Sequence, residues 1–144
     1  MIEIRAHVEI ERPAGEVFTF LADMANNPTW QKGMQECRWT SDPPLRLGST
    51  YDQVARFLGK EIVSSFEVTE YEEGRLIRIE STAGPMTLDI TRSVDAGSAG
   101  RSTVSAIVRG DSSGVYRLAD PIMRLLVGRS VRADYRRLKA HLES

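Results

Sequence analysis

The sequence is poor in the side chains that build metal sites and nucleophilic active sites. Its 144 residues include one cysteine, Cys37, and two histidines, His7 and His141. A single cysteine excludes an internal disulfide, and so few nitrogen and sulfur ligands disfavour a metal centre. A phosphate-binding loop and a dinucleotide-binding fingerprint are missing as well. We therefore expect no metal and no cofactor, and we expect Cys37 to be a small buried side chain.

Long apolar runs and an excess of one charge are also missing. The 19 basic and 20 acidic side chains give a formal net charge of -1, which does not favour nucleic acid as a partner. No apolar stretch approaches the roughly 20 residues that span a bilayer, and the N-terminal residues lack the regions of a signal peptide. These absences predict a cytoplasmic protein with no nucleic-acid partner and no integral membrane segment.

Alternating apolar and polar residues occupy most of the chain and predict seven strands. The turns between them are short and rich in Gly, Pro and acidic residues, so neighbouring strands must be antiparallel. We expect strands at residues 2–11, 36–41, 49–57, 60–71, 75–81, 86–94 and 101–110.

Helical signals occur after the first strand and at the end of the chain. Pro13 suits a first helical turn, and Asn27 with Pro28 predicts a second short helix capped by Asn27 and closed by Gly33. Residues 115–144 change to helical spacing, with Asp120 as a cap. There is no repeat and no linker, so a single domain, residues 1–144, is expected.

Three segments of this pattern resemble one known family. Residues 11–23 (ERPAGEVFTFLAD) run into residues 27–30 (NPTW), residues 66–71 are FEVTEY, and residues 138–143 are LKAHLE. In this order they resemble the START-like polyketide cyclase/dehydrase and lipid-transport superfamily, over essentially the whole chain. The resemblance implies an α+β helix-grip fold: a seven-stranded curved antiparallel sheet around a long C-terminal helix, with two short helices between the first two strands. It also implies a cavity for an apolar ligand.

The residues that line such a cavity should lie on the less charged side of each strand. Trp30 belongs either to the cavity rim or to the packing of the short helices against the sheet. From the strands and the C-terminal helix together, the expected ligand-binding residues are Trp39, Tyr51, Gln53, Phe66, Met86, Leu88, Arg124, Gly128, Val131 and Tyr135.

The apolar residues of the C-terminal helix fall on two faces, which leaves two arrangements open. At about 100° per residue, Val131 and Tyr135 share one face, whereas Leu118, Ile122, Leu125 and Leu126 lie about half a turn away. A straight helix points Arg124 and Gly128 toward the cavity and exposes Ile122 and Leu125. A helix that bends near Gly128 brings those leucines inward.

Three functions remain open on the sequence alone. The first is binding or carrying a small, mostly apolar molecule such as a lipid, polyketide or quinone. The second is a cyclase or dehydratase that uses general acid/base catalysis, with Tyr51 and Arg124 as the candidate catalytic residues. The third is a homodimer or partner-binding module that uses the surface of Leu118, Ile122 and Leu125.

Overall fold

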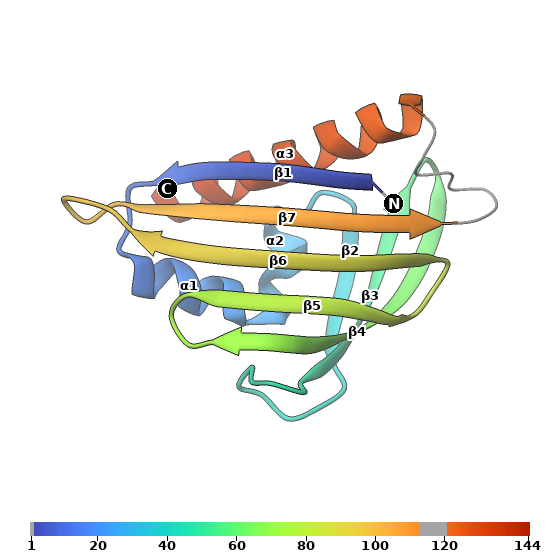
Figure 1. Ribbon diagram of the computed structural model, residues 1–144, viewed down its shortest axis with the longest axis horizontal. Coiled ribbons are helices and arrows are strands. Elements are labelled where there is room, and N and C mark those ends of the chain that lie inside the picture. The colour runs from blue at the N-terminus through green and yellow to red at the C-terminus, as the bar shows by residue number, and fades with distance from the viewer. Residues whose placement is uncertain (1, 113–120) are drawn as a thin grey trace.

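The computed structural model describes residues 2–112 and 121–144. Seven strands, two α-helices of the N-terminal half and one short 3-10 helix precede a long C-terminal helix (Figure 1). Their bounds, in chain order, are β1 (Ile2–Ile10), α1 (Ala14–Ala22), η1 (Met24–Asn26), α2 (Asn27–Trp30), β2 (Met34–Trp39), β3 (Thr50–Phe57), β4 (Lys60–Glu72), β5 (Leu76–Ala83), β6 (Met86–Ala96), β7 (Ser102–Ser112) and α3 (Pro121–Glu143).

All seven strands form one antiparallel sheet in the order β1-β7-β6-β5-β4-β3-β2. Consecutive strands from β2 to β7 are neighbours, and β1 closes the series beside β7. The predicted fold class and strand set are therefore confirmed, with strand ends that differ by one or two residues. Short loops made this outcome predictable, because only antiparallel neighbours can be joined by so few residues.

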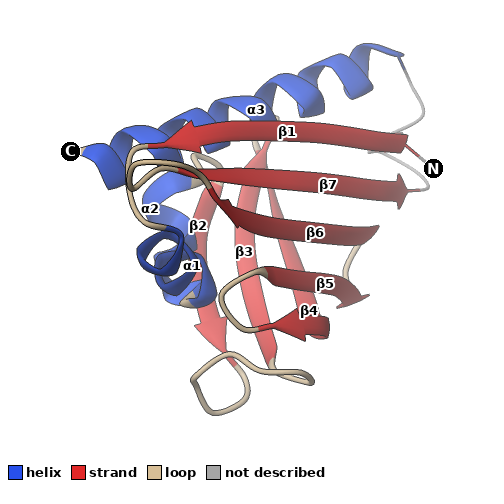
Figure 2. Ribbon diagram, turned by 60° about the vertical axis from the view of Figure 1, so that its left-hand side comes forward, coloured by secondary structure: helices blue, strands red, loops and turns tan. Residues whose placement is uncertain are grey.

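The sheet is strongly curved (Figure 2). Register shifts interrupt the ladders between Met34 and Glu36 in β2, and at two places in the β4–β5 ladder, where Thr82 of β5 and Thr69 of β4 are the extra residues. An extra residue at such a point bends its strand and increases the local twist. The β2 end of the sheet consequently crosses the direction of β1 and β7, and the concave face becomes deep enough to enclose side chains.

Helix α3 is one continuous helix that runs alongside β1 (Figures 1 and 2). Tyr135 and Leu138 are buried in the main core, so the lower half of the helix holds the sheet as expected. The helix does not break at Gly128, as the straight arrangement requires, although the side chain of Arg124 does not point where that arrangement placed it. Leu118 and the proposed cap Asp120 lie outside the described residues.

The segment between α1 and β2 differs from its prediction. Met24 belongs to η1, where the Asp23 carboxylate accepts a hydrogen bond from the backbone N–H of Ala25 at 3.1 Å. Asn27 does not cap α2; its buried side-chain amide faces the sulfurs of Met24 and Cys37 at 3.6 and 3.7 Å. The amide is drawn into the core because η1 continues directly into α2 and leaves no extended residue to act as a cap.

Gly33 lies after the end of α2 rather than closing it. Its carbonyl accepts a hydrogen bond from the backbone N–H of Arg56 at 2.7 Å. A Cβ added to Gly33 would stand 2.9 Å from the carbonyl oxygen of Arg56. Glycine is required here because the chain passes against the backbone of β3 at the rim of the concave face.

Candidate ligand-binding cavity

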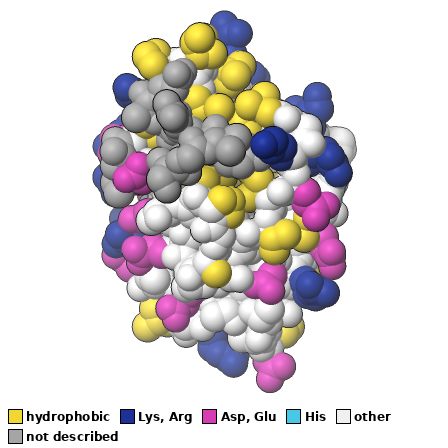
Figure 3. All heavy atoms as spheres, turned by 90° about the vertical axis from the view of Figure 1, so that its right-hand side faces the viewer, with side chains coloured by type: hydrophobic (Ala, Val, Ile, Leu, Met, Phe, Trp, Pro, Cys, Tyr) yellow, Lys and Arg dark blue, Asp and Glu magenta, His cyan; other side chains and the backbone are white. Residues whose placement is uncertain are grey.

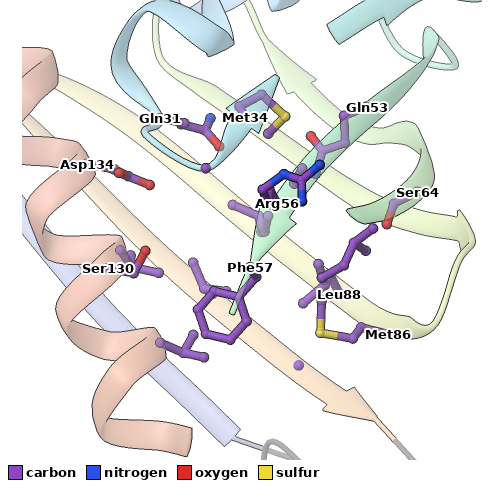
Figure 4. Close-up of a pocket in the computed structure, with 18 of the residues that line it drawn as sticks. Gln31, Met34, Gln53, Arg56, Phe57, Ser64, Met86, Leu88, Ser130 and Asp134 are labelled. Carbon is purple, nitrogen blue, oxygen red and sulfur yellow. The ribbon is translucent and has the colours of Figure 1, made fainter. Parts of the chain in front are cut away.

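A cavity of about 210 Å³ lies between the concave face of the sheet and α3 (Figure 4). Most of its wall is apolar, and its polar side chains come from several elements. The residues that line it are Ile2, Trp30, Gln31, Gly33, Met34, Gln53, Ala55, Arg56, Phe57, Ile62, Ser64, Met86, Leu88, Ile90, Arg92, Val108, Gly110, Val127, Ser130, Val131, Asp134 and Tyr135.

The two long walls follow from the periods of their elements. On β6 every second residue from Met86 to Arg92 faces the cavity, as the alternation of a strand requires. On α3 the lining residues recur after three or four positions, from Val127 through Val131 to Asp134. Val127 and Val131 also pack against Ile2 and Ile4 of β1, and this contact fixes the rotation of the helix about its axis.

Arg92 places a full positive charge at the inner end of the cavity. Its side chain is only 5% exposed. Its Nε donates a hydrogen bond to the Tyr135 hydroxyl at 3.1 Å, and its guanidinium carbon lies 5.1 Å from the centre of the Trp30 ring. Burial acts to lower the pKa of Arg92, but the oxygens of Tyr135 and Tyr51 outweigh it, and the guanidinium stays charged.

Trp30 and Tyr135 complete this inner end. Their ring centres are 5.0 Å apart, and the carbonyl of Trp30 accepts a hydrogen bond from Arg137 Nε at 3.3 Å. Because α2 is thereby attached to α3, both possibilities considered for Trp30 hold together: the ring packs the short helix against the core and also lines the cavity.

Asp134 supplies the carboxylate of the cavity. It accepts a hydrogen bond from the backbone N–H of Lys32 at 3.2 Å and a close one from Arg137. Burial raises the pKa of the Asp134 carboxyl above its ordinary value, although both hydrogen bonds act in the opposite direction. In Figure 4, Asp134 and Ser130 extend from α3 on one side of the cavity, and Gln53 and Arg56 come from β3 on the other.

Several buried polar atoms around this end have no hydrogen-bond partner within the described chain. Trp30 Nε1, Gln31 Nε2 and Arg92 Nη1 belong to residues that line the cavity, and the Tyr51 hydroxyl lies in the core beside them. Buried polar groups are nearly always paired in folded proteins. These unpaired donors belong to residues of the cavity wall but are themselves covered, so a ligand or water reaches them only when the side chains shift slightly.

The residues predicted to bind a ligand divide into three groups: residues that line the cavity, residues that pack in or beside the core, and two residues elsewhere on α3. Gln53, Met86, Leu88, Val131 and Tyr135 line the cavity together. Tyr51 and Phe66 instead stack on each other in the core, with ring centres 5.4 Å apart, and Trp39 packs beside that core. Burial raises the pKa of the Tyr51 hydroxyl, which therefore remains protonated.

Arg124 and Gly128 lie elsewhere on α3. Arg124 is exposed and is not among the residues that line the cavity, in contrast to the direction expected for a straight helix. Gly128 is buried, and a Cβ there would meet Arg132 Nη1 at 3.1 Å. The cavity-facing stripe is rotated from the expected one because Val127 and Val131 dock on β1.

Arg92 and Asp134 are the charged cavity residues of most interest that were not predicted from the sequence; Gln31, Arg56 and Ser130 were not predicted either. Arg92 continues the alternation of Met86, Leu88 and Ile90, so strand parity alone was enough to place it inward. Asp134 follows Val131 by three positions on the helix, and that spacing was likewise available. Neither residue was included in the predicted cavity, because charged side chains are seldom buried.

Cys37 is buried, as expected of a free cysteine with no catalytic base beside it. Burial raises the pKa of its thiol to about 11, so the thiolate needed by a nucleophile is scarce at neutral pH.

Within residues 2–112 and 121–144, no group of three or more His, Cys, Asp or Glu side chains gathers as metal ligands would. No helix in the same residues is long and apolar enough to cross a membrane.

Three apolar side chains in the first two turns of α3 are exposed to solvent. Ile122 is 71% exposed, Leu125 54% and Leu126 38%. Figure 3 shows hydrophobic side chains gathered at this end. Exposure of Ile122 and Leu125 is what the straight helix predicted.

A curved antiparallel sheet closed over a cavity by a long C-terminal helix defines the helix-grip class of ligand-binding folds. Within that class, a family model described as polyketide cyclase / dehydrase and lipid transport matches residues 1–143. The chain belongs to this family, as its sequence motifs suggested. A search of the curated proteins finds no matching relative.

Solved structures share the fold at low sequence identity. A START superfamily protein from Mycobacterium smegmatis has a TM-score of 0.81 and 15% identity, over 98% of this chain and 97% of that one. The Zhui aromatase/cyclase from a Streptomyces species has a TM-score of 0.79 and 12% identity, over 99% and 93%. A major latex-like protein of Panax ginseng has a TM-score of 0.77 and 12% identity, over 99% and 98%.

Proposed function

We propose that the chain, acting as one ligand-binding domain of residues 1–144, binds a small, mostly apolar molecule between the sheet and α3 as a carrier or binding protein. The cavity of about 210 Å³ carries the proposal. Its mostly apolar wall with a few polar side chains is typical of small-molecule sites. A lipid, polyketide or quinone, or an apolar part of one, has this chemistry.

The cavity is small for its class. Sites for drug-sized ligands usually measure about 300–1,000 Å³, so we expect a compact ligand, or a longer one whose remainder occupies the mouth. Ser130 and Arg56 line the cavity and are themselves exposed, which places both at that mouth. A ligand can therefore enter between α3 and the β3–β4 hairpin.

Native mass spectrometry of the purified protein, with solvent extraction, tests the proposal first. A co-purifying apolar molecule or micromolar uptake of an apolar fluorescent probe is expected. Ser130→Trp places a large side chain at the mouth and should weaken probe uptake about tenfold or more, because the new ring occupies ligand space. A protein that takes up no apolar molecule would contradict the proposal.

Arg129→Trp is the matched control for that variant. Arg129 is the exposed neighbour of Ser130 on α3 and does not line the cavity. It should bind the probe like the wild type. Equal loss in both variants would show that the effect comes from the helix surface and not from the cavity.

A cyclase or dehydratase is the alternative, and Asp134 favours it. Its cavity-facing carboxyl has a raised pKa, so it holds a proton more readily than an ordinary aspartate, as a general acid or base must. The earlier candidates, Tyr51 and Arg124, do not line the cavity. With a linear poly-β-ketone thioester as substrate, Asp134→Asn should abolish cyclised product in a chromatographic assay while probe binding persists. Wild-type protein that forms no product above buffer would exclude this activity for that substrate class.

A homodimer through the start of α3 stays a prediction. Ile122 and Leu125 present apolar surface there, and exposed apolar patches often mark interfaces. Light scattering at several concentrations should show a mass that rises toward that of a dimer. A strict monomer at all concentrations would contradict it.

A further inference from the structure

Arg92 is a buried cation that the described chain leaves without an anion in direct contact. Ion pairs within residues 2–112 and 121–144 engage arginines elsewhere, and none joins Arg92 to a carboxylate. The nearest partners are a neutral hydroxyl, that of Tyr135, and the face of the Trp30 ring. Both stabilise the charge, but neither cancels it.

Asp134, the cavity carboxylate, does not fill this role. Its hydrogen-bonded oxygen is held by Arg137 and by the backbone N–H of Lys32. It makes no direct ion pair with Arg92, whose charge acts on it only through space, in the direction that lowers the pKa of Asp134. Removing a charge from water without a counterion is strongly unfavourable. The contacts within the described chain do not supply that counterion, so we look for it in a ligand.

Two unpaired donors stand at this position. Arg92 Nη1 and Trp30 Nε1 are buried, have no partner, and belong to cavity-lining residues that touch each other. Guanidinium and indole groups can only donate. Only an acceptor can satisfy them, and an acceptor with negative charge would also neutralise Arg92.

Building on the proposed function, we infer that the ligand carries an anionic oxygen, as in a carboxylate or an enolate, and that Arg92 Nη1 binds this oxygen with Trp30 Nε1 as a second donor. The apolar body of the ligand then extends along Leu88, Ile90 and Val131 toward the mouth. Tyr135 holds the guanidinium in place through its hydroxyl. The alternative partner of these donors is ordered water, and the experiment must distinguish water from an anionic ligand.

Three probes of similar shape test the inference by isothermal titration calorimetry at neutral pH. Naphthoate carries the anionic oxygens, methyl naphthyl ketone carries a neutral carbonyl, and ethylnaphthalene carries no acceptor. A charge-assisted hydrogen bond predicts that naphthoate binds about tenfold or more tightly than ethylnaphthalene, with the ketone between them.

Arg92→Met removes the charge and keeps an apolar side chain of similar length. It should reduce naphthoate affinity about tenfold or more and change ethylnaphthalene affinity by less than about threefold. Arg78→Met is the matched control, because Arg78 lies on the neighbouring strand β5 and bonds Asp89 and Glu70 outside the cavity. It loses the same charge and should leave the order of the three probes unchanged.

Trp30→Phe provides a second variant in case Arg92→Met does not fold by circular dichroism. It keeps a ring beside Arg92 and removes the Nε1 donor, so it should weaken naphthoate by about threefold to tenfold and spare ethylnaphthalene.

The outcomes separate the two proposals. Equal affinity for all three probes, with no response to Arg92→Met, would leave the apolar cavity in place and overturn the anion site, since water then satisfies the donors. A preference for naphthoate that survives both variants would also overturn it. Failure of every probe to bind would overturn the proposed function and this inference with it.

Discussion

Arg78 and Arg92 occupy adjacent strands and opposite faces of the sheet, and their surroundings differ completely. On the outer face, Arg78 donates to both oxygens of Asp89 at 3.0 and 2.7 Å and to Glu70 at 2.8 Å. On the inner face, Arg92, which is paired with Ile77 in the β5–β6 ladder, meets a phenol and an indole ring.

The difference shows what each face is built for. On the outer face, Arg78 forms ion pairs with carboxylates of the same sheet, and these partners raise its pKa. The inner arginine is surrounded by apolar residues and unpaired donors. A sheet that gives its outer Arg78 two carboxylate partners, yet leaves the buried Arg92 without one beside a cavity, has an inner face suited to a ligand that brings its own negative charge.

The largest effect on stability should come from truncating an apolar side chain of the inner face. Phe66→Ala removes a side chain that is 1% exposed and stacked on Tyr51, and should lower the free energy of unfolding by about 3–5 kcal/mol. Glu67→Ala, the next residue on the outer face, should change it by less than about 0.5 kcal/mol. Urea denaturation checks both; comparable losses would show that the two faces do not differ in packing.

The two arginine variants should differ in stability, and only the outer one should lose any. Arg92→Met removes an unpaired buried charge, so the free energy of unfolding should stay equal or rise by up to about 4 kcal/mol. Arg78→Met breaks partly exposed pairs and should lower it by about 1 kcal/mol or less. Thermal and urea unfolding without ligand measure this, and a clear loss on Arg92→Met would show that the guanidinium serves folding.

Asp134 should give a smaller effect that depends on pH. Its folded pKa is raised, so its contribution to stability is fully present below the ordinary carboxyl pKa and is lost as the pH rises through the folded value. Asp134→Asn removes this loss. The stability of the variant relative to the wild type should therefore increase from pH 4 toward neutrality; a flat or falling difference in urea denaturation would contradict the raised pKa.

Arg124→Ala should have the smallest effect. The side chain is exposed and outside the cavity, and exposed charges are screened by salt. Naphthoate affinity by calorimetry should stay within about twofold of the wild type at physiological ionic strength. A tenfold loss would restore the orientation of α3 that the sequence predicted.

Local periodicity was enough to predict the strands and the grip of Tyr135 and Leu138, because both depend on residues a few positions apart. The rotation of the upper part of α3 was not predictable, since it depends on Val127 and Val131 meeting Ile2 and Ile4 across more than a hundred residues of chain. Asn27 was assigned to a cap for the same reason: the pattern did not reveal that Met24 and Cys37 would surround it.

Arg92 shows a different limit of sequence reasoning. Its position on β6 was predictable from alternation, but its unpaired state was not, because whether a carboxylate faces it depends on α2, α3 and the sheet together. Because buried charges are rare, the residues of β6 predicted to face inward ended at Ile90 and did not include Arg92.

A crystal structure of the protein soaked with naphthoate tests the central claim most directly. We predict a carboxylate oxygen about 2.7–2.9 Å from Arg92 Nη1, with the rings against Leu88, Ile90 and Val131. A naphthoate bound in reverse, with its carboxylate at the mouth beside Arg56, or a cavity that stays filled with water, would contradict it.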